Sequence, residues 1–301
     1  MANESKDNEV KDLGKVTGYI YLVLTFVIWG SLYVAAKSVM TEIPATAVLA
    51  SRYIIAVVAL YFIMRKRGFK KVKKEHRKMF FLVGFVGYFC GIAFQLVGTD
   101  LIDASLASLI NSLNPVVIPI IAAIFLNERL TVKTCVSIVL SIAGVYIILG
   151  VGGNASIMGI IVNILSLLFW SASCCMVRGI SKDYDPIQIT LYAMAIAVCF
   201  AIPTAVYSII KSPCTLSVNG FISLLYIGLI CTALSHVLWN KSLKLLPATT
   251  CSLFYPIQPL TSAILAILVL GEKLTVPFII GAVLICIGMT VTVYEPRKRE
   301  R

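Results

Sequence analysis

Hydrophobic residues in this chain are grouped into long runs that short polar connections separate. A helix needs about twenty consecutive apolar residues to cross the hydrocarbon core of a bilayer. On that length the pattern predicts spans at residues 17–37, 44–64, 79–98, 104–126, 132–149, 157–178, 187–209, 219–240, 248–270 and 275–294. We therefore predict an all-α integral membrane protein with ten transmembrane helices, each packed beside its neighbour in sequence.

The second half of the sequence repeats the first. Residues 127–131 read Asn-Glu-Arg-Leu-Thr and residues 271–275 read Gly-Glu-Lys-Leu-Thr, and the same spacing of 144 aligns Pro115 with Pro259. Because each half holds an odd number of predicted spans, five, the two halves enter the membrane from opposite sides. Inverted repeats of this kind are typical of secondary transporters, whose binding site lies near the midplane where the halves meet.

The distribution of Lys and Arg predicts the orientation of the chain, because these residues favour the cytosolic side. With the N-terminus in the cytosol, 22 of the 26 fall on the cytosolic side and three on the outer side, and Arg52 lies within a span. Both chain ends are then cytosolic. The predicted parts are a cytosolic tail (1–16), a first five-helix repeat (17–149), an outer linker (150–156), a second five-helix repeat (157–294) and a basic cytosolic tail (295–301).

Composition agrees with a membrane protein. Mean hydropathy is +0.94 and charged residues make up 13% of the chain, against about 25% in soluble domains. The net charge of +12 does not indicate nucleic-acid binding, because nine basic residues lie in the loop 65–78 and four in the tail 297–301, directly after spans. Basic clusters in such places favour anionic lipid as a partner. We expect no nucleic acid, no cofactor and no metal, and the nine cysteines lie mostly inside apolar runs, as packing residues do.

Polar side chains inside the membrane are costly, so they tend to face a cavity or a partner helix. The predicted fourth and ninth spans carry matching polar stripes, in which Asn111 aligns with Tyr255 and Asn114 with Gln258. Each pair lies about 10–15 Å inside its helix at about 1.5 Å per residue. Because the two spans run from opposite faces, all four side chains reach the bilayer centre.

Trp29 and Trp170 align at a spacing of 141 and lie at the same depth, although Trp usually prefers the interface. We predict a central substrate cavity lined by Trp29, Asn111, Asn114, Trp170, Tyr255 and Gln258. Amide and hydroxyl groups would orient a polar ligand, and the indoles would bind its apolar part. The alternative is that the amides bond across helices and the Trp side chains fill volume.

Four basic or titratable side chains near this layer have more than one interpretation. Arg52 lies within the second span with no acidic residue in any predicted span to pair with it, so it binds either backbone carbonyls or a substrate carboxylate. Lys37 and Arg178 end the first and sixth helices, and each either extends toward the interface or belongs to a gate. His236, predicted four residues from the cytosolic end of the eighth span, is either a packing residue or a proton carrier.

Two pairs of aligned residues complete the candidate gating or structural set. Glu128 and Glu272 close the fourth and ninth helices, where each either pairs with a basic residue across the repeat interface or faces water. Pro115 and Pro259 free backbone carbonyls at midplane depth. Each therefore bends its helix or exposes carbonyls to a ligand, although proline is also simply tolerated in membrane helices.

Several of these features occur together in one known group of proteins. They are the segment Phe-Val-Ile-Trp-Gly-Ser at 26–31 followed by Lys37, the pair Arg52-Tyr53, the Asn114-Pro115 and Gln258-Pro259 sites, and the two Glu-(Arg/Lys)-Leu-Thr turns. As an ordered set the chain resembles the drug/metabolite transporter superfamily, and within it the EamA-type exporters. One departure is that Ser171 follows Trp170, where Gly30 follows Trp29.

The resemblance implies a ten-helix transporter with cytosolic termini. Its central cavity would be formed mainly by helices one, three, four, six, eight and nine, with the fifth and tenth at the periphery. Members export amino acids, other metabolites or drugs, and some are facilitators. The chain lacks the membrane-buried glutamate of the small four-helix multidrug relatives, so their proton-exchange mechanism does not carry over.

The function that we predict is therefore secondary transport, not catalysis. The protein would export or facilitate passage of a small polar or amphipathic metabolite, such as an amino acid, across the cytoplasmic membrane by alternating access. A membrane-embedded enzyme is an alternative, but it needs paired acid and base groups, a metal cluster or an activated nucleophile. A channel is another, and channels usually show charged rings or repeated filter sequences.

Overall fold

The computed structural model describes the chain in several stretches, and every regular element in them is helical. The described residues are 2–111, 113–114, 116–117, 121, 132, 135–136, 139–140, 143–144, 147, 156–180, 183–212, 214–246, 251, 254–255, 257–273 and 275–293, with side chains left out at 2–14, 178–179 and 289–293. Pro115, Glu128, the Arg178 side chain and parts of the predicted fourth and fifth spans therefore lie outside the described residues.

Six helical segments of the described chain are long and apolar enough to cross a membrane. They are Lys15–Met40, Ala45–Arg67, Lys74–Leu101, Ile157–Val177, Pro186–Lys211 and Val218–Leu245. These correspond to the first, second, third, sixth, seventh and eighth predicted spans. The protein is thus a multi-pass membrane protein, and its described part is helical throughout.

Three of these segments are single α-helices and a fourth is the membrane part of a longer one. The four helices are α1 (Ala2–Met40), α2 (Ala45–Arg67), α8 (Ile157–Ile180) and α9 (Pro186–Lys211). The sequence-based boundaries place a separate tail at residues 1–16, whereas α1 continues back to Ala2.

The third and eighth segments are built from several helical pieces. The third consists of η1 (Lys74–His76), α3 (Arg77–Leu82), η2 (Val83–Gly91) and α4 (Ile92–Leu101). The eighth consists of α10 (Val218–Tyr226), η3 (Ile227–Leu234) and α11 (Ser235–Leu245). Both η2 and η3 are π-helical, and they begin 144 residues apart, which is the spacing of the sequence repeat.

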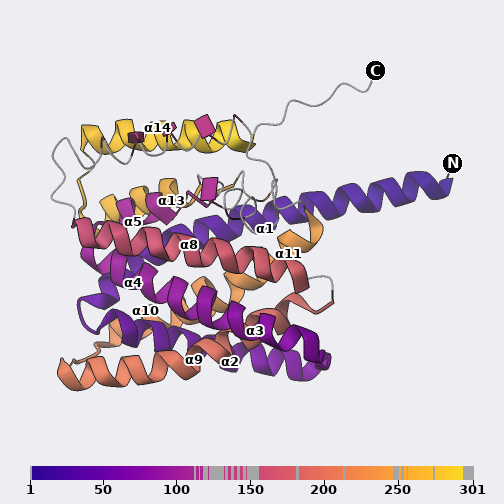
Figure 1. Cartoon of the computed structure of the whole chain (residues 1–301), viewed down its shortest axis with the longest axis horizontal. Helices are drawn as coiled ribbons and strands as arrows, with labels where there is room; N and C mark the ends of the chain where they lie inside the picture. The colour runs from indigo at the N-terminus through magenta and orange to yellow at the C-terminus, as the bar shows by residue number, and fades with distance from the viewer. Residues whose placement is uncertain are drawn as a thin grey trace.

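The remaining described helices are shorter. They are α5 (Ala104–Asn111), α13 (Ile257–Leu265), the π-helical η4 (Ala266–Leu270) and α14 (Val276–Val293). Figure 1 shows α14 along one edge of the bundle, with α2 and α9 at the opposite edge.

The most extensive helix contacts join the first half of the chain to the second. α2 packs against α9, α4 and η2 against α8, α1 against α11 and α13, and α5 against α13. The largest buried apolar cluster accordingly draws on both halves. The interior of the bundle is therefore an interface between the halves.

Close approach of two of these helices depends on Gly30. A β-carbon at this position would lie 2.7 Å from the backbone oxygen of Gln258 and 2.7 Å from Thr261 Cβ. Since real β-carbons essentially never approach so closely, glycine lets α1 lie directly against α13. This contact brings Trp29 beside the residues of the ninth predicted span.

Candidate functional site: a cavity between the two halves

A small cavity lies between the two halves of the bundle. It is lined by Trp29, Leu32, Tyr33, Arg52, Ile92, Gln95, Asn111, Asn114, Ser166, Trp170, His236, Tyr255 and Gln258. All six residues predicted to bind substrate are in this set. The space open to the centres of water molecules is about 40 Å³, and a single water needs about 10–15 Å³ of such space. In this conformation the cavity therefore has room for a few water molecules, and any larger ligand would need a wider conformation.

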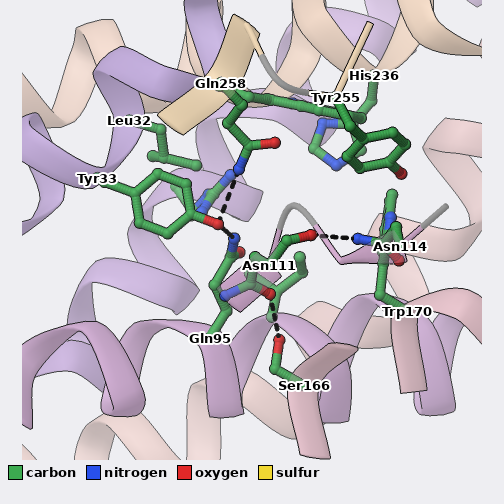
Figure 2. Close-up of a pocket in the computed structure, with 13 residues that line it drawn as sticks. Leu32, Tyr33, Gln95, Asn111, Asn114, Ser166, Trp170, His236, Tyr255 and Gln258 are labelled. Atoms are coloured by element: carbon green, nitrogen blue, oxygen red, sulfur yellow. Dashed lines mark hydrogen bonds between the residues drawn. The ribbon is translucent and has the colours of Figure 1, made fainter. Parts of the chain in front are cut away.

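One side of the cavity is aromatic. The rings of Trp29 and Trp170 meet edge to face with their centroids 6.0 Å apart, and His236 lies 5.4 Å from Trp29 and 5.7 Å from Trp170. Tyr88 packs on both Trp170 and His236, at 5.6 Å and 5.4 Å. Figure 2 shows Trp170, His236 and Tyr255 together on this side. Such rings offer an apolar surface to a ligand and also attract cations through their faces.

The opposite side carries a cluster of uncharged polar groups around Tyr33. The Gln258 amide donates to the Tyr33 hydroxyl at 3.0 Å, and the Gln95 amide donates to the same oxygen, as Figure 2 shows. A phenol oxygen that accepts two N–H groups still has its own O–H to donate. The cluster thus joins α1, α4 and α13 and presents a hydroxyl donor at the cavity.

Asn111 and Asn114 line the cavity, but their amides are largely engaged with the protein. The Asn111 side chain donates to Ala107 O at 3.0 Å and to Asn163 Oδ1 at 2.8 Å. The Asn114 side chain donates to the backbone oxygen of Asn111 at 2.5 Å and accepts from Ser171 Oγ at 2.8 Å. Asn111 and Asn114 therefore match both sequence-based interpretations. They border the cavity, and their hydrogen bonds also join α5 to α8.

Arg52 is fully buried at the cavity, on α2. Its Nε–H donates to Thr232 Oγ1 at 2.7 Å, and the Thr232 hydroxyl in turn donates to the Ile227 carbonyl at 2.7 Å. Both residues of that bond lie in the π-helix η3, a form found often at functional sites. Among the described residues the terminal nitrogens Nη1 and Nη2 have no hydrogen-bond partner.

At one end of the bundle, Lys37 and Glu272 act on helix ends. Lys37 Nζ donates to Thr99 O at 3.2 Å and to Ile102 O, at the C-terminal end of α4. Glu272 accepts from Ala104 N at 2.9 Å and from Ser105 Oγ at 2.8 Å, at the N-terminal end of α5. Each charge thus lies at the helix end whose dipole it complements. Neither sequence-based interpretation of Glu272 describes this contact, because its partners in the described chain are backbone N–H groups and a hydroxyl.

Two carboxyl groups outside the spans at this end have shifted pKa values. Burial, followed by the neighbouring Glu272 carboxylate, raises the pKa of Asp103, although Lys37 opposes the shift. The backbone N–H and then the hydroxyl of Ser217 lower the pKa of Glu42 by hydrogen bonding to its carboxylate. Ser217 is the N-cap of α10, so Glu42 connects the α1–α2 turn to the start of the eighth span.

At the other end, the basic loop contacts the connection between α8 and α9. Lys70 Nζ donates to Asp183 O at 2.6 Å, and Lys73 Nζ lies 3.8 Å from Asp183 Oδ1. His76 Nδ1 lies 3.0 Å from the Tyr184 hydroxyl. Part of the basic loop is therefore occupied by protein contacts.

Comparison with known proteins shows to which family this chain belongs. The model of the EamA-like transporter family matches residues 16–150 and again residues 157–294. The chain belongs to the EamA-like transporter family. This confirms the resemblance seen in the sequence.

Individual EamA-like relatives are similar along nearly their whole length. A protein of Archaeoglobus fulgidus named an uncharacterized transporter is 27% identical over 283 residues, which are 93% of this chain and 99% of the relative. The uncharacterized transporter YyaM of Bacillus subtilis is 24% identical over 282 residues, 90% of this chain and 92% of its own. A solved crystal structure shares the fold with a TM-score of 0.66 at 16% identity, covering 93% of this chain and 96% of that one.

His236 lies at a different depth in this EamA-like structure from the one that the sequence predicted. The eighth span continues to Leu245, so His236 lies nine residues before its end rather than four, and it faces the cavity among aromatic rings. Its Nδ1 lies 2.9 Å from the Thr232 carbonyl oxygen. Pro259 lines a separate apolar cavity with residues of α14 such as Phe278 and Ala282.

Several residues of the EamA-like cavity were not predicted from the sequence, although spacing from predicted site residues could have indicated some of them. Tyr33 lies four residues after Trp29, and Ser166 four before Trp170, so each shares a helix face with a predicted site residue. Gln95 lies three residues from the predicted end of the third span, whereas the helix continues to Leu101 and places it deeper. Among the described residues, no group of three or more His, Cys, Asp and Glu side chains can hold a metal ion.

Proposed function

We propose that the protein is a secondary transporter that moves a small polar or amphipathic metabolite, such as an amino acid, across the cytoplasmic membrane. The observation that carries this proposal is the cavity itself. Residues chosen from aligned positions of the two halves line one buried space between those halves. A site at a repeat interface is typical of secondary transporters.

The transport mode that we propose is alternating access, with ten helices in two inverted five-helix repeats. Support comes from the two family matches and from the π-helices η2 and η3, which begin 144 residues apart. The small volume of the cavity supports a carrier over an open channel. Export or facilitated passage is the direction that we propose for this family member.

Both termini are proposed to lie in the cytosol on the distribution of Lys and Arg. Contacts between connections support the grouping of these connections into two opposite sides. The Glu42–Ser217 contact joins two connections assigned to the outer side, and the Glu272–Ser105 contact joins another of these connections to the first turn of α5. The contact of Lys70 with Asp183 joins two connections assigned to the cytosolic side. Exposed lysines of the same basic loop are free to contact anionic lipid, which we propose as a partner there.

The test is counterflow into proteoliposomes that contain the purified protein and a preloaded panel of amino acids. We expect accumulation of at least one labelled compound, and a loss of about tenfold or more in Trp29→Ala, Asn114→Ala and Gln258→Ala. Val58→Ala is a matched control, because Val58 is 52% exposed on α2, away from the cavity. Transport that survives all three cavity substitutions would assign the site elsewhere, and absence of counterflow for every compound would contradict the transporter proposal for this panel.

A further inference from the structure

Arg52 is a buried cation whose binding capacity is only partly used. A guanidinium carries five N–H donors, and within the described chain Nε–H bonds to Thr232 while Nη1 and Nη2 bond to nothing. The side chain is 0% exposed. Buried charges in proteins are normally paired and hydrogen-bonded, and no Asp or Glu is among the described residues that line the cavity.

We infer that Arg52 binds the carboxylate of the transported molecule, and that the substrate class is a monocarboxylate with an apolar or aromatic body. The inference rests on the proposed transport function and identifies the ligand of the same cavity. The planar guanidinium fork matches a carboxylate with two parallel N–H···O bonds. With Nε–H held by Thr232, the terminal nitrogens are the pair that is left for this role.

The charge of the cavity favours a monoanion. Arg52 supplies one positive charge, and the polar side chains of Tyr33, Gln95 and Gln258 in the same lining carry none. The Tyr33 hydroxyl, which already accepts two amide N–H groups, has a proton to donate to a further lone pair of the carboxylate. A phosphate dianion would carry one charge more than the lining compensates.

The aromatic side of the cavity fits the remainder of such a molecule. Trp170 lies across the cavity from the Tyr33 cluster, as Figure 2 shows, and its ring meets the ring of Trp29 edge to face. An ammonium group would meet no carboxylate among the described lining residues, and ring faces, amide oxygens and hydroxyl oxygens would be its partners. The carboxylate is therefore the required group, and an amine is optional.

The protein contains its own reporter for a binding test. Its three tryptophans are Trp29, Trp170 and Trp239; the first two line the cavity and Trp239 lies 5.5 Å from Trp29. Tryptophan emission of the full chain in nanodiscs would be titrated with five probes. They are 3-phenylpropanoate, 3-phenylpropanamide, phenylalanine, phenylalaninamide and phenyl phosphate.

We expect a saturable emission change with both carboxylates, and binding at least about tenfold weaker with the two amides, which keep the size and lose the anion. Equal binding of acids and amides would overturn the inference, as would tighter binding of phenyl phosphate than of 3-phenylpropanoate or an absence of binding by every probe. This comparison of ligands uses the unaltered protein, so it tests the preference for a carboxylate even if a variant fails to fold.

Amino-acid substitutions test whether Arg52 is the side chain that binds the carboxylate. Arg52→Gln should weaken 3-phenylpropanoate binding about tenfold or more, and Thr232→Val should weaken it less, because Thr232 only positions the guanidinium. Arg77→Gln, at an exposed arginine in the basic loop, should bind as the unaltered protein does. A lower thermal midpoint of ligand-free Arg52→Gln, with unchanged binding of acids, would make Arg52 a structural residue and overturn the inference.

Counterflow with the same probes separates this inference from the transport proposal. Transport of amides as fast as acids, insensitive to Arg52→Gln, would leave the transporter proposal standing and overturn the carboxylate site. Acid binding that depends on Arg52, without counterflow of any bound acid, would support the carboxylate site and contradict transport of these acids.

Discussion

The indole N–H of Trp29 donates a hydrogen bond of 2.9 Å to the hydroxyl of Ser235. Ser235 Oγ donates onward to the Cys231 carbonyl at 2.7 Å, so one hydroxyl joins the aromatic side of the cavity to the eighth span. Both residues are buried. The orientation of the Trp29 ring therefore depends on a side chain that is 206 residues away in sequence.

Ser235→Ala should leave the buried Trp29 N–H without an acceptor. Loss of one partner of a buried hydrogen bond costs about 1–3 kcal/mol, and we expect the free energy of unfolding to fall by about that amount. Chemical unfolding followed by tryptophan emission measures it. Ser223→Ala on α10 is the control, and an equal effect of the two substitutions would mean that the Trp29–Ser235 bond contributes nothing.

Gly30→Ala should separate α1 from α13, since its β-carbon would lie 2.7 Å from the Gln258 backbone oxygen. Overpacking of this kind typically costs about 1–3 kcal/mol, and displacement of Gln258 should also weaken ligand binding. Gly91→Ala is a matched control, because its β-carbon would meet nothing closer than 3.4 Å. Thermal unfolding in detergent compares the two variants, and an unchanged midpoint for Gly30→Ala would contradict the close contact.

Glu272→Ala should loosen the start of α5, because the Glu272 carboxylate accepts from Ala104 N and from Ser105 N and Oγ. Removal of a helix N-cap costs about 0.5–2 kcal/mol, so we expect a loss of stability in that range. Hydrogen exchange at the Ala104 and Ser105 amides reports the change locally. The neighbouring exposed Lys273 provides the control Lys273→Ala, which should leave exchange at these amides unaltered.

The Glu42–Ser217 contact should make stability depend on pH in the acid range. Ser217 lowers the pKa of Glu42 in the folded protein, so the folded state binds this proton less readily than the unfolded state. The contribution is therefore present above the usual carboxyl pKa and is lost as pH falls through the lowered value. Unfolding measured from neutral pH to about pH 3 should show a shallower decline in Glu42→Gln and in Ser217→Ala; unchanged slopes would exclude the contact as a source of acid sensitivity.

The basic loop should bind anionic lipid through its exposed lysines. Lys66, Lys71 and Lys74 are exposed and make no ion pair with a described residue, whereas Lys70 and Lys73 contact Asp183. Each lysine near an anionic surface contributes about 1 kcal/mol. Native mass spectrometry should therefore show fewer retained phosphatidylglycerol molecules after substitution of these three by Gln. Substitution of Lys211 and Lys273, on the opposite proposed side, should leave retention unchanged.

Much of the helical layout could be predicted from the sequence, and the errors have local causes. The six long apolar helices fall where apolar runs reach the length of a bilayer. The third and eighth spans continue beyond their predicted ends to Leu101 and Leu245, because polar residues there continue helices whose apolar runs have ended. Because these two spans are longer than predicted, Gln95 and His236 lie further from the helix ends than the predicted boundaries place them.

The cavity could be outlined from the sequence, since depth in the bilayer follows from position in a span and helical spacing determines which side chains share a face. By itself the sequence determined a helical membrane protein of this family and six residues that border one cavity. The tertiary structure alone decided which polar groups are satisfied. Asn111 and Asn114 bond within the protein, Glu272 caps α5, and Arg52 meets Thr232 with two nitrogens left over. Such pairings join residues far apart in the chain, and helical periodicity carries no information about which distant helix supplies the partner.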